Sequence, residues 1–509
     1  MTTLDQVEST HFDTVVIGFG KAGKTLAMGL ANAGRSVALI EESPAMYGGT
    51  CINIGCVPTK TLLHDADLHS AVAPGSATGP DDYSSAMERK KALRKKMNAA
   101  NLAMVEKPGA VVIDGRAEFL GERRIKVTAG TDELEVTGEN VIINTGATPR
   151  VPTIDGLPDN PVEDPRVLFS TELIDRDALP RRMAVLGAGF IGLELANMYA
   201  KFGSEVTVLN GKDRLVPHED SEASEAIEEV LTQNGVRFLF GTSLTSVDAP
   251  QSTEAPLTLN LDVDGEAQAL EVDALLISIG RVPRTEGLGL EAAGVETGPR
   301  GVVDDFLRTS AKNVWAVGDV NGGPQFTFVS YDDHRIVKDQ LLAGKGETGR
   351  SLANRGPVPN CTFLTPPFAR VGLSEKDARQ KAKEEGWDVA VARAKVADIA
   401  VMPRPKPVAE ARGYLQVVVD RKTEQIGCHV VLHRCPGSDQ HGDPRHEAPV
   451  ALHRIARRDL HPPVDDRRVQ RSAPADLTCR RRRGPAPRTE RANGVFGGKP
   501  AIGWRFPAA

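Results

Sequence analysis

Two cysteines with four residues between them, Cys51 and Cys56, have the spacing and surroundings of a redox pair. Gly48 and Gly49 precede them, and glycines let the backbone approach a ligand closely. A helix is expected to start near Pro58, and one helical turn plus a bend brings two Cα atoms within the roughly 7 Å that a disulfide requires. Thiols near a helix N-terminus are stabilised as thiolates. The segment therefore predicts a dithiol that cycles between oxidised and reduced forms; two buried cysteines in a Gly-rich loop are the alternative.

The segment ahead of the cysteines has the pattern of a dinucleotide-binding unit. An apolar strand, residues 14–17, breaks into the spaced glycines Gly18, Gly20 and Gly23, and a helical pattern follows. This spacing permits the tight turn, the approach of a pyrophosphate to the helix N-terminus and close helix packing. A second strand ends in Glu41, where an acid can accept hydrogen bonds from ribose hydroxyls. The unit predicts a dinucleotide site, with a strand–helix–strand unit that binds no ligand as the alternative.

The fingerprint is repeated after another apolar strand, residues 183–186, at Gly187, Gly189 and Gly192. Its second strand ends in Asn210 instead of an acid, and Lys212 and Arg214 follow. An acid would bind a free 2′-hydroxyl and repel a 2′-phosphate, so a neutral Asn near two cations favours NADPH over NADH. Ordinary loop charges are the alternative. Two fingerprints in one chain imply two dinucleotides.

Length and composition indicate a multidomain soluble enzyme. The 509 residues suggest about three domains, and 40% hydrophobic with 26% charged residues is ordinary. A net charge of −6 gives no reason to expect nucleic acid or anionic membrane as a partner. A basic run within the helical pattern of residues 81–107 is expected to be a solvated face. Without a secretory signal, an apolar run of membrane-spanning length or a dense cysteine framework, the expected location is the cytoplasm.

The string GGTCINIGCVPTK resembles the redox centre of the flavin-dependent pyridine nucleotide–disulfide oxidoreductases, and its extension KTLLHDA resembles the reactive-chlorine-resistance and mercuric reductase branch. The resemblance implies an α/β fold of two Rossmann-type three-layer domains plus an α+β interface domain. It places the first part of an FAD domain at 1–150, an NAD(P) domain at 151–279, the return of the FAD domain at 280–350, and the start of a dimerisation domain at 351–426.

The same resemblance implies an electron path. NADPH (or NADH) reduces FAD, FAD reduces the cysteine pair, and the pair reduces a small-molecule disulfide, a metal ion such as Hg(II) or Cu(II), or another oxidant. Cys56 would face the flavin and Cys51 would attack the substrate. Lys60 would pair with Glu194 beside the flavin, and Phe190 would gate the nicotinamide pocket. The further cofactor-binding residues that it implies are Gly49, Thr50, Ala117, Thr145, Gly146, Ile191, Gly280, Arg281, Gly318 and Asp319.

The resemblance stops near residue 426. Residues 427–509 hold 15 of the chain's Arg, 6 of its 11 His and 10 of its 34 Pro, and their net charge is +8 against −14 for the remainder. This composition predicts a disordered tail that cannot complete the interface domain. Family members form homodimers in which a His-Pro motif serves the partner's dithiol. Here that motif is missing, because His461-Pro462 is expected to be an ordinary loop, so dimerisation is doubtful.

A slip of the coding frame near Ile426 would explain the tail. With synonymous codons chosen freely, reading one base later permits a translation that contains HPSMTE, the family's missing motif. The tail also raises a second hypothesis for function: an FAD- and NAD(P)H-binding, diaphorase-like protein without dithiol catalysis.

Overall fold

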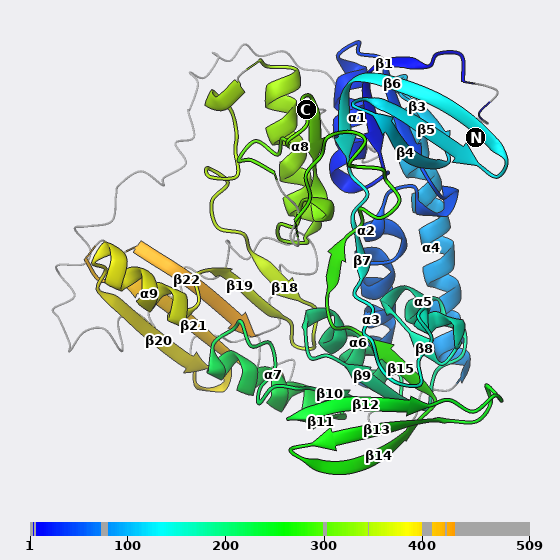
Figure 1. The fold of residues 1–509 in the computed structure, drawn as a ribbon. Helices are drawn as coiled ribbons and strands as arrows, with labels where there is room; N and C mark the ends of the chain where they lie inside the picture. The colour runs from blue at the N-terminus through cyan, green and yellow to red at the C-terminus, as the bar shows by residue number, and fades with distance from the viewer. Residues whose placement is uncertain are drawn as a thin grey trace, which may run out of the picture. The chain divides into compact units, whose positions relative to one another are not determined.

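A computed structural model describes residues 4, 7–72, 80–298, 303–344, 346–399, 410–422 and 425–432, and these form the mixed α/β fold that the sequence predicts (Figure 1). The predictions made for residues 433–509, including the loop at His461-Pro462, lie outside the described residues. No helix in the described part of the chain is long and apolar enough to cross a membrane.

The first glycine fingerprint belongs to a seven-stranded sheet with the order β3-β2-β1-β6-β5-β4, in which β17 pairs with β6. Its strands are β1 (His11–Ile17), β2 (Val37–Glu41), β3 (Val111–Asp114), β4 (Arg116–Gly121), β5 (Arg124–Ala129), β6 (Asp132–Ile143) and β17 (Val314–Ala316). Helix α1 (Lys21–Asn32) contacts α4 (Pro80–Glu106), α8 (Thr327–Leu341) and strands β1 and β2, and α4 contacts β3. Ile336 and Val337 of α8 belong to the same core cluster as Val16 of β1. Val15 and Val16 are fully buried, as expected for a parallel strand covered on both faces.

The second fingerprint belongs to a five-stranded parallel sheet with the order β11-β10-β9-β15-β8. Its strands are β8 (Val167–Leu168), β9 (Arg182–Leu186), β10 (Glu205–Leu209), β11 (Val236–Leu239) and β15 (Ala274–Ile277). Its helices are α5 (Ser170–Asp175), α6 (Phe190–Lys201) and α7 (Ser221–Gln233). An antiparallel sheet adjoins it, formed by β12 (Thr242–Asp248), β13 (Leu257–Val263) and β14 (Glu266–Val272).

The chain passes between the two units through a pair of antiparallel strands, β7 (Ala147–Pro149) and β16 (Arg281–Pro283). Gly146 and Gly280 precede these strands with φ angles of +76° and +111°, a region that glycine enters without strain. The proposed domain boundaries at 150 and 280 fall in this crossing. The crossing brings together two groups of candidate site residues that lie more than a hundred positions apart.

The third of the large sheets is antiparallel, with the order β18-β19-β22-β21-β20, and carries helix α9 (Glu375–Glu385). Its strands are β18 (Asn360–Thr362), β19 (Phe368–Gly372), β20 (Val389–Lys395), β21 (Tyr414–Asp420) and β22 (Gln425–Leu432). Strand β22 lies between β19 and β21, with His429 opposite both Val371 and Val417. The prediction that this fold stops at residue 426 is therefore wrong by six residues, since residues 427–432 continue a strand. The segment Cys-His-Val-Val-Leu retains enough strand-favouring residues to pair.

The basic helix predicted at residues 81–107 is α4, and most of its basic run is paired within the chain. Arg89 pairs with Asp65 at 2.8 Å, and Arg94 pairs with Asp175 at 2.7 Å. Lys90 has a fully buried side chain and pairs with Asp175 at 2.6 Å. The prediction of a solvated face is therefore wrong for Lys90, which joins α4 to the end of α5.

Candidate active site

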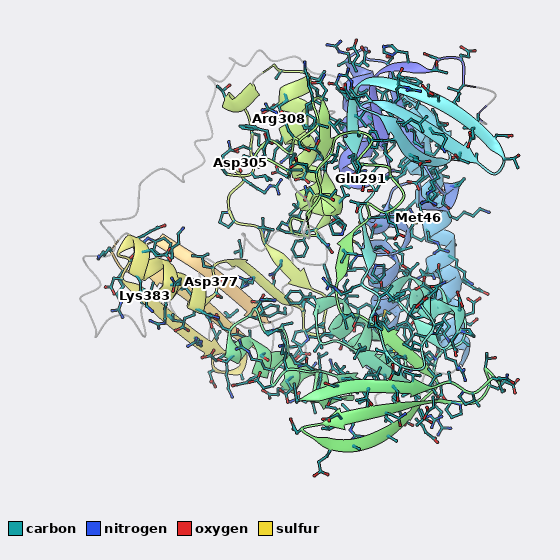
Figure 2. The ribbon with its side chains drawn as sticks, in the orientation of Figure 1. Met46, Glu291, Asp305, Arg308, Asp377 and Lys383 are labelled. Carbon is teal, nitrogen blue, oxygen red and sulfur yellow. The ribbon has the colours of Figure 1, made fainter. Side chains whose placement is uncertain are left out.

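Two helices present the two cysteines. The turn η2 (Pro44–Met46), whose last residue is labelled in Figure 2, leads into α2 (Thr50–Asn53), which carries Cys51. Helix α3 (Cys56–Val72) begins at Cys56 itself, two residues earlier than expected. Cys56 therefore lies at a helix N-terminus, where the free backbone N–H groups favour negative charge.

The cysteine segment contacts the first glycine loop. Gly49 has a φ of +73° and caps α2, and a Cβ atom built on it would lie 2.6 Å from the Cα of Gly20. Only glycine fits this approach. The dithiol and the first fingerprint thus meet at the N-termini of α2 and α1.

The two thiols have opposite electrostatic surroundings. The Cys51 thiol donates a hydrogen bond to the Cys56 sulfur, the Thr327 hydroxyl lies 3.4 Å from that sulfur, and the Lys60 ammonium adds positive charge. These contacts outweigh burial and lower the pKa of Cys56 from 9.0 to about 6. The same hydrogen bond, together with burial, raises the pKa of Cys51. At neutral pH Cys56 therefore carries the negative charge and Cys51 retains the proton.

Lys60 and Glu194, which only the family resemblance joined, form an ion pair between α3 and α6. Lys60 lies one helical turn after Cys56, and its ammonium stands 4.0 Å from the centroid of the Phe363 ring. The backbone N–H of Phe363 donates to the second Glu194 oxygen at 3.3 Å. The ion pair is therefore held by residues from α3, from α6 and from the segment that follows β18.

Phe190 opens helix α6 and stacks on Phe368 of β19, with ring centroids 6.5 Å apart and planes inclined by 18°. The neighbouring side chain, Ile191, is 43% exposed. An aromatic side chain at this helix start is in place to cover a ligand that binds at the second glycine loop.

The first glycine loop fits a dinucleotide because its packing excludes side chains. A Cβ on Gly18, Gly20 or Gly23 would lie within 2.8 Å of Asn144 or Val16 atoms. The Asn144 amide fills the space below the loop and donates to the Gly18 carbonyl at 2.9 Å. Helix α1 begins at Gly20 without a side-chain cap, so its free N–H groups suit a pyrophosphate.

Glu41 lies at the end of β2, where the sequence predicts a ribose acceptor. Its carboxylate accepts hydrogen bonds from the backbone N–H groups of Phe19 at 2.8 Å and Ser43 at 3.2 Å. Burial nevertheless raises its pKa above the ordinary value. The carboxylate thus lies at the rim of the glycine loop.

The second glycine loop has the same steric character. A Cβ on Gly187 would lie 2.8 Å from the Ser278 carbonyl oxygen, and one on Gly192 would lie 2.4 Å from the Gly187 carbonyl oxygen. Gly189, at the N-cap of α6, faces open space. Open backbone at an uncapped helix start suits a phosphate group.

Asn210 holds the loop after β10. Its side chain is buried, its amide donates to the Arg214 carbonyl at 2.9 Å, and its oxygen accepts from the Lys212 N–H at 3.4 Å. The residue that the sequence places at the adenosine ribose therefore shapes the segment that carries Lys212 and Arg214.

Arg281 and Asp319 face each other where the chain returns to the first unit. Arg281 donates to the Ala147 carbonyl, and burial lowers its pKa and raises that of Asp319. Gly318 precedes Asp319 in the turn η4 (Gly318–Asn321), and its N–H donates to buried Asp333 of α8 at 2.7 Å.

The remaining predicted cofactor residues are distributed around these two loops. Thr50 is the first residue of α2, and Ala117 is buried in β4. The Thr145 hydroxyl donates to the Arg284 carbonyl at 2.7 Å, and the Arg284 N–H donates back to Gly146 at 3.0 Å.

Sequence reasoning missed several residues of the site. Thr327, Phe363 and Phe368 contact Cys56, Lys60 and Phe190 respectively from distant parts of the chain. No spacing rule links Thr327 to a cysteine 271 positions earlier.

Comparison with known proteins identifies the two glycine fingerprints and the dithiol as parts of one module. A family model described as pyridine nucleotide-disulphide oxidoreductase matches residues 12–333, and a model of the dimerisation domain of the same family matches residues 358–436. The second match extends ten residues beyond the predicted end of the resemblance, in agreement with strand β22.

Curated relatives cover most of the chain. The probable pyridine nucleotide-disulfide oxidoreductase RclA of Escherichia coli is 44% identical over 82% of this chain and 88% of its own length. A mercuric reductase of Staphylococcus aureus is 34% identical over 87% of this chain and 77% of its own length. A solved structure, the Cu(II) complex of the HOCl-induced flavoprotein disulfide reductase RclA from Escherichia coli, superposes with a TM-score of 0.74. It is 41% identical and covers 84% of this chain and 90% of that chain.

Proposed function

Since this chain belongs to the pyridine nucleotide-disulphide oxidoreductase family, we propose that it uses NAD(P)H to reduce its Cys51–Cys56 pair and passes the electron pair on to an oxidant. Enzymes of this family are FAD-dependent and take their electrons from NAD(P)H. The acceptor is a disulfide, a metal ion such as Hg(II) or Cu(II), or another small oxidant. A disulfide or Hg(II) takes both electrons, whereas Cu(II) takes them one at a time.

The unequal thiol pair is the observation that carries this proposal. The pKa of Cys56 is lowered to about 6, while the hydrogen bond to Cys56 keeps the proton on Cys51. A structural disulfide does not require its two thiols to differ in pKa, whereas thiol–disulfide exchange requires one sulfur to be a thiolate.

The two glycine loops provide sites for the two cofactors. We assign FAD to the loop at Gly18, Gly20 and Gly23, with Glu41 and Asp319 as polar partners, and NAD(P)H to the loop at Gly187, Gly189 and Gly192. When bound, FAD supplies hydride acceptance from the nicotinamide and two-electron reduction of a disulfide. Lys60, paired with Glu194, places positive charge next to the dithiol. Phe190 excludes water from the second site.

The choice between the nicotinamides follows from the loop after β10. Lys212 and Arg214 are cations on a segment that Asn210 holds, and no carboxylate occupies the end of the strand. This arrangement favours a 2′-phosphate, so NADPH is the proposed donor.

Turnover with defined acceptors tests the proposal. The FAD-loaded chain should reduce a chromogenic aromatic disulfide with NADPH, and Cys51→Ser and Cys56→Ser should abolish that reaction while reduction of a dye by NADPH continues. Cu(II) and Hg(II) in place of the disulfide would identify the acceptor class. Equal turnover by both serine variants would contradict dithiol catalysis.

A second candidate is a diaphorase-like protein that binds FAD and NAD(P)H without dithiol catalysis. It is favoured by the composition of residues 437–509, which follow the matched dimerisation segment. Dye reduction without any reduction of a disulfide or metal ion in the unmodified chain would support it.

A further inference from the structure

A buried lysine on helix α1, Lys24, lies against the segment that leads into Cys51. Lys24 is only 7% exposed, and its ammonium donates to the side-chain oxygen of Asn101, which is 6% exposed. The Asn101 amide donates to the Met97 carbonyl at 2.7 Å, which fixes its oxygen toward Lys24. A buried ammonium with a neutral partner is costly, so its position calls for an explanation.

The backbone brings this ammonium to the cysteine segment. Lys24 lies one helical turn after Gly20, with its N–H bonded to the Gly20 carbonyl at 3.0 Å. Gly20 touches Gly49, the cap of the helix that carries Cys51. On the other side, a Cβ on Gly48 would lie 3.1 Å from Asn101. Lys24 and Asn101 therefore lie against the segment that begins at Gly48.

Residues 18–25 read Gly-Phe-Gly-Lys-Ala-Gly-Lys-Thr, a string that also fits a phosphate-binding loop. The structure argues against that role for the end of the string. Lys24 is buried against Asn101, and the Thr25 hydroxyl donates back to the Lys21 carbonyl at 2.7 Å.

We propose that Lys24 is a positioning residue for the dithiol, whose ammonium stabilises the Cys51 thiolate when that sulfur attacks the substrate. The inference rests on the proposed function. In the reaction with a substrate disulfide, Cys51 gives up its proton, its thiolate forms a bond to one substrate sulfur while the substrate S–S bond breaks, and the departing thiolate takes that proton. The Cys56 thiolate then attacks the Cys51 sulfur, which forms the Cys51–Cys56 disulfide and releases the second substrate thiol. Two electrons pass from the dithiol to the substrate.

The charged groups around the two sulfurs differ, and each cysteine has its own nearby lysine. Cys56 has Lys60 on its own helix and Thr327 on α8, whereas Cys51 interacts with Cys56, with Thr327 and with Lys24. Lys24 in turn faces Lys21 on α1, Cys51 on α2 and Asn101 on α4. Burial lowers the pKa of Lys24 to about 8, so it is charged at neutral pH and loses this charge as the pH rises through 8.

Alkylation of the reduced, FAD-loaded full chain tests the proposal without a physiological acceptor. The protein is reduced with dithiothreitol, freed of it, and treated with iodoacetamide from pH 5 to 10, and the modified cysteine is identified by peptide mass. In Lys24→Met the apparent pKa of Cys51 should rise by about one unit, and its alkylation at pH 7 should slow about tenfold. The difference should be largest below pH 8.

Matched variants separate charge from structure. Lys24→Arg should keep the alkylation profile, because it keeps the charge. Lys96→Met removes one charge from the exposed side of α4, the helix that carries Asn101, and should leave the rate at pH 7 unchanged. Asn101→Asp should slow alkylation as Lys24→Met does, because a carboxylate would neutralise Lys24, and it carries the test if Lys24→Met does not fold.

Unchanged Cys51 profiles in Lys24→Met or Asn101→Asp would overturn the proposal. The same holds if Lys24→Met loses FAD while the profile stays, which would make Lys24 a phosphate or packing residue. If reduction exposes no alkylatable Cys51 in the unmodified chain, the proposed dithiol function itself fails.

Discussion

At the scale of single residues, one hydrogen bond decides which sulfur carries the charge. The Cys51 thiol donates to Cys56, and α3 begins at Cys56, so both contacts favour the same thiolate. The sequence predicts a redox pair from the cysteines alone, whereas the difference in pKa between the two thiols follows from their surroundings in the structure.

The Cys56 thiolate should titrate near pH 6 in the reduced, FAD-loaded protein. Its pKa lies below the ordinary value of 9.0, so the thiolate is present at pH 7 and is lost as the pH falls through about 6. The expected signal is a long-wavelength charge-transfer band between the Cys56 thiolate and oxidised FAD, recorded while the cysteines are reduced. The intensity of this band should fall with a midpoint near pH 6. Cys56→Ser should abolish the band and Cys51→Ser should keep it; the reverse result would exchange the two roles.

Lys60 and Glu194 should move that midpoint in opposite directions. Lys60→Met removes a cation that lowers the pKa of Cys56, so the midpoint should rise. Glu194→Gln leaves Lys60 without its carboxylate, so the midpoint should fall. Lys96→Met, on the exposed side of α4, is the control and should leave it unchanged. Shifts of the same sign in the first two variants would contradict the ion-pair account.

The residues that the sequence could not supply are those that reach the site through tertiary contacts. Lys60 follows Cys56 by one turn, so a local motif contains both. Thr327, at the start of α8, contacts Cys56, and Phe363, just after β18, contacts Lys60. Both lie far along the chain from α3, and no periodicity encodes such a meeting.

At the scale of elements, helix α8 organises the side of the site that we assign to FAD. It begins at Thr327, beside Cys56, and its buried Asp333 accepts from the Gly318 N–H at 2.7 Å and from Asn321 at 3.0 Å. Arg355 pairs with the other Asp333 oxygen. One helix thus connects the dithiol to the turn that carries Asp319.

Asp333→Ala should therefore both destabilise the fold and weaken FAD retention. It leaves the mostly buried Arg355 without one partner and the Gly318 N–H without an acceptor, a loss of about 3–5 kcal/mol for a broken buried pair. Urea unfolding and FAD retention on ultrafiltration measure the two effects. Asp305→Ala, at an exposed position labelled in Figure 2, is the control and should change stability by less than about 0.5 kcal/mol. Normal FAD retention in Asp333→Ala would contradict the role of the turn.

The loop after β10 should set the nicotinamide preference. Asn210→Asp keeps the size of the buried side chain and its acceptor for the Lys212 N–H, loses the donor to the Arg214 carbonyl, and adds negative charge near the proposed 2′-phosphate. The kcat/KM for NADPH should fall about tenfold, equal to about 1.4 kcal/mol, with little change for NADH. Asn234→Asp, at the end of α7, provides a control of equal chemistry. A clear preference of the unmodified protein for NADH would overturn the assignment.

The strands that carry the two fingerprints follow from apolar runs and spaced glycines, and β1, β9 and β10 lie where the sequence predicts them. The start of α3 at Cys56 does not follow, because helix ends depend on capping and on contacts of the preceding loop. The burial of Lys90 could not be predicted from composition either, because its partner Asp175 lies at the end of α5, far along the chain.

At the scale of the whole molecule, the third sheet reaches further than composition predicts. Strand β22 is central, between β19 and β21, so residues 425–432 complete the backbone pairing of both neighbours. The average composition of residues 427–509 conceals these first few strand-forming residues. The dimerisation-domain match ends at residue 436, and the Arg- and Pro-rich sequence follows.

Restoring the coding frame after Ile426 should therefore raise disulfide reduction, which depends on a partner subunit. Dye reduction, which does not, should stay the same. A translation that the shifted frame permits contains the family's His-Pro motif, and a general acid–base residue contributes about 10²–10⁴-fold. Disulfide reduction should rise by at least about 100-fold in the corrected protein, and sedimentation should show a stable dimer. Dye reduction by NADPH should change little, because the two glycine loops and α6 precede the corrected segment. A stable dimer with full disulfide turnover in the unmodified chain would refute the frame slip.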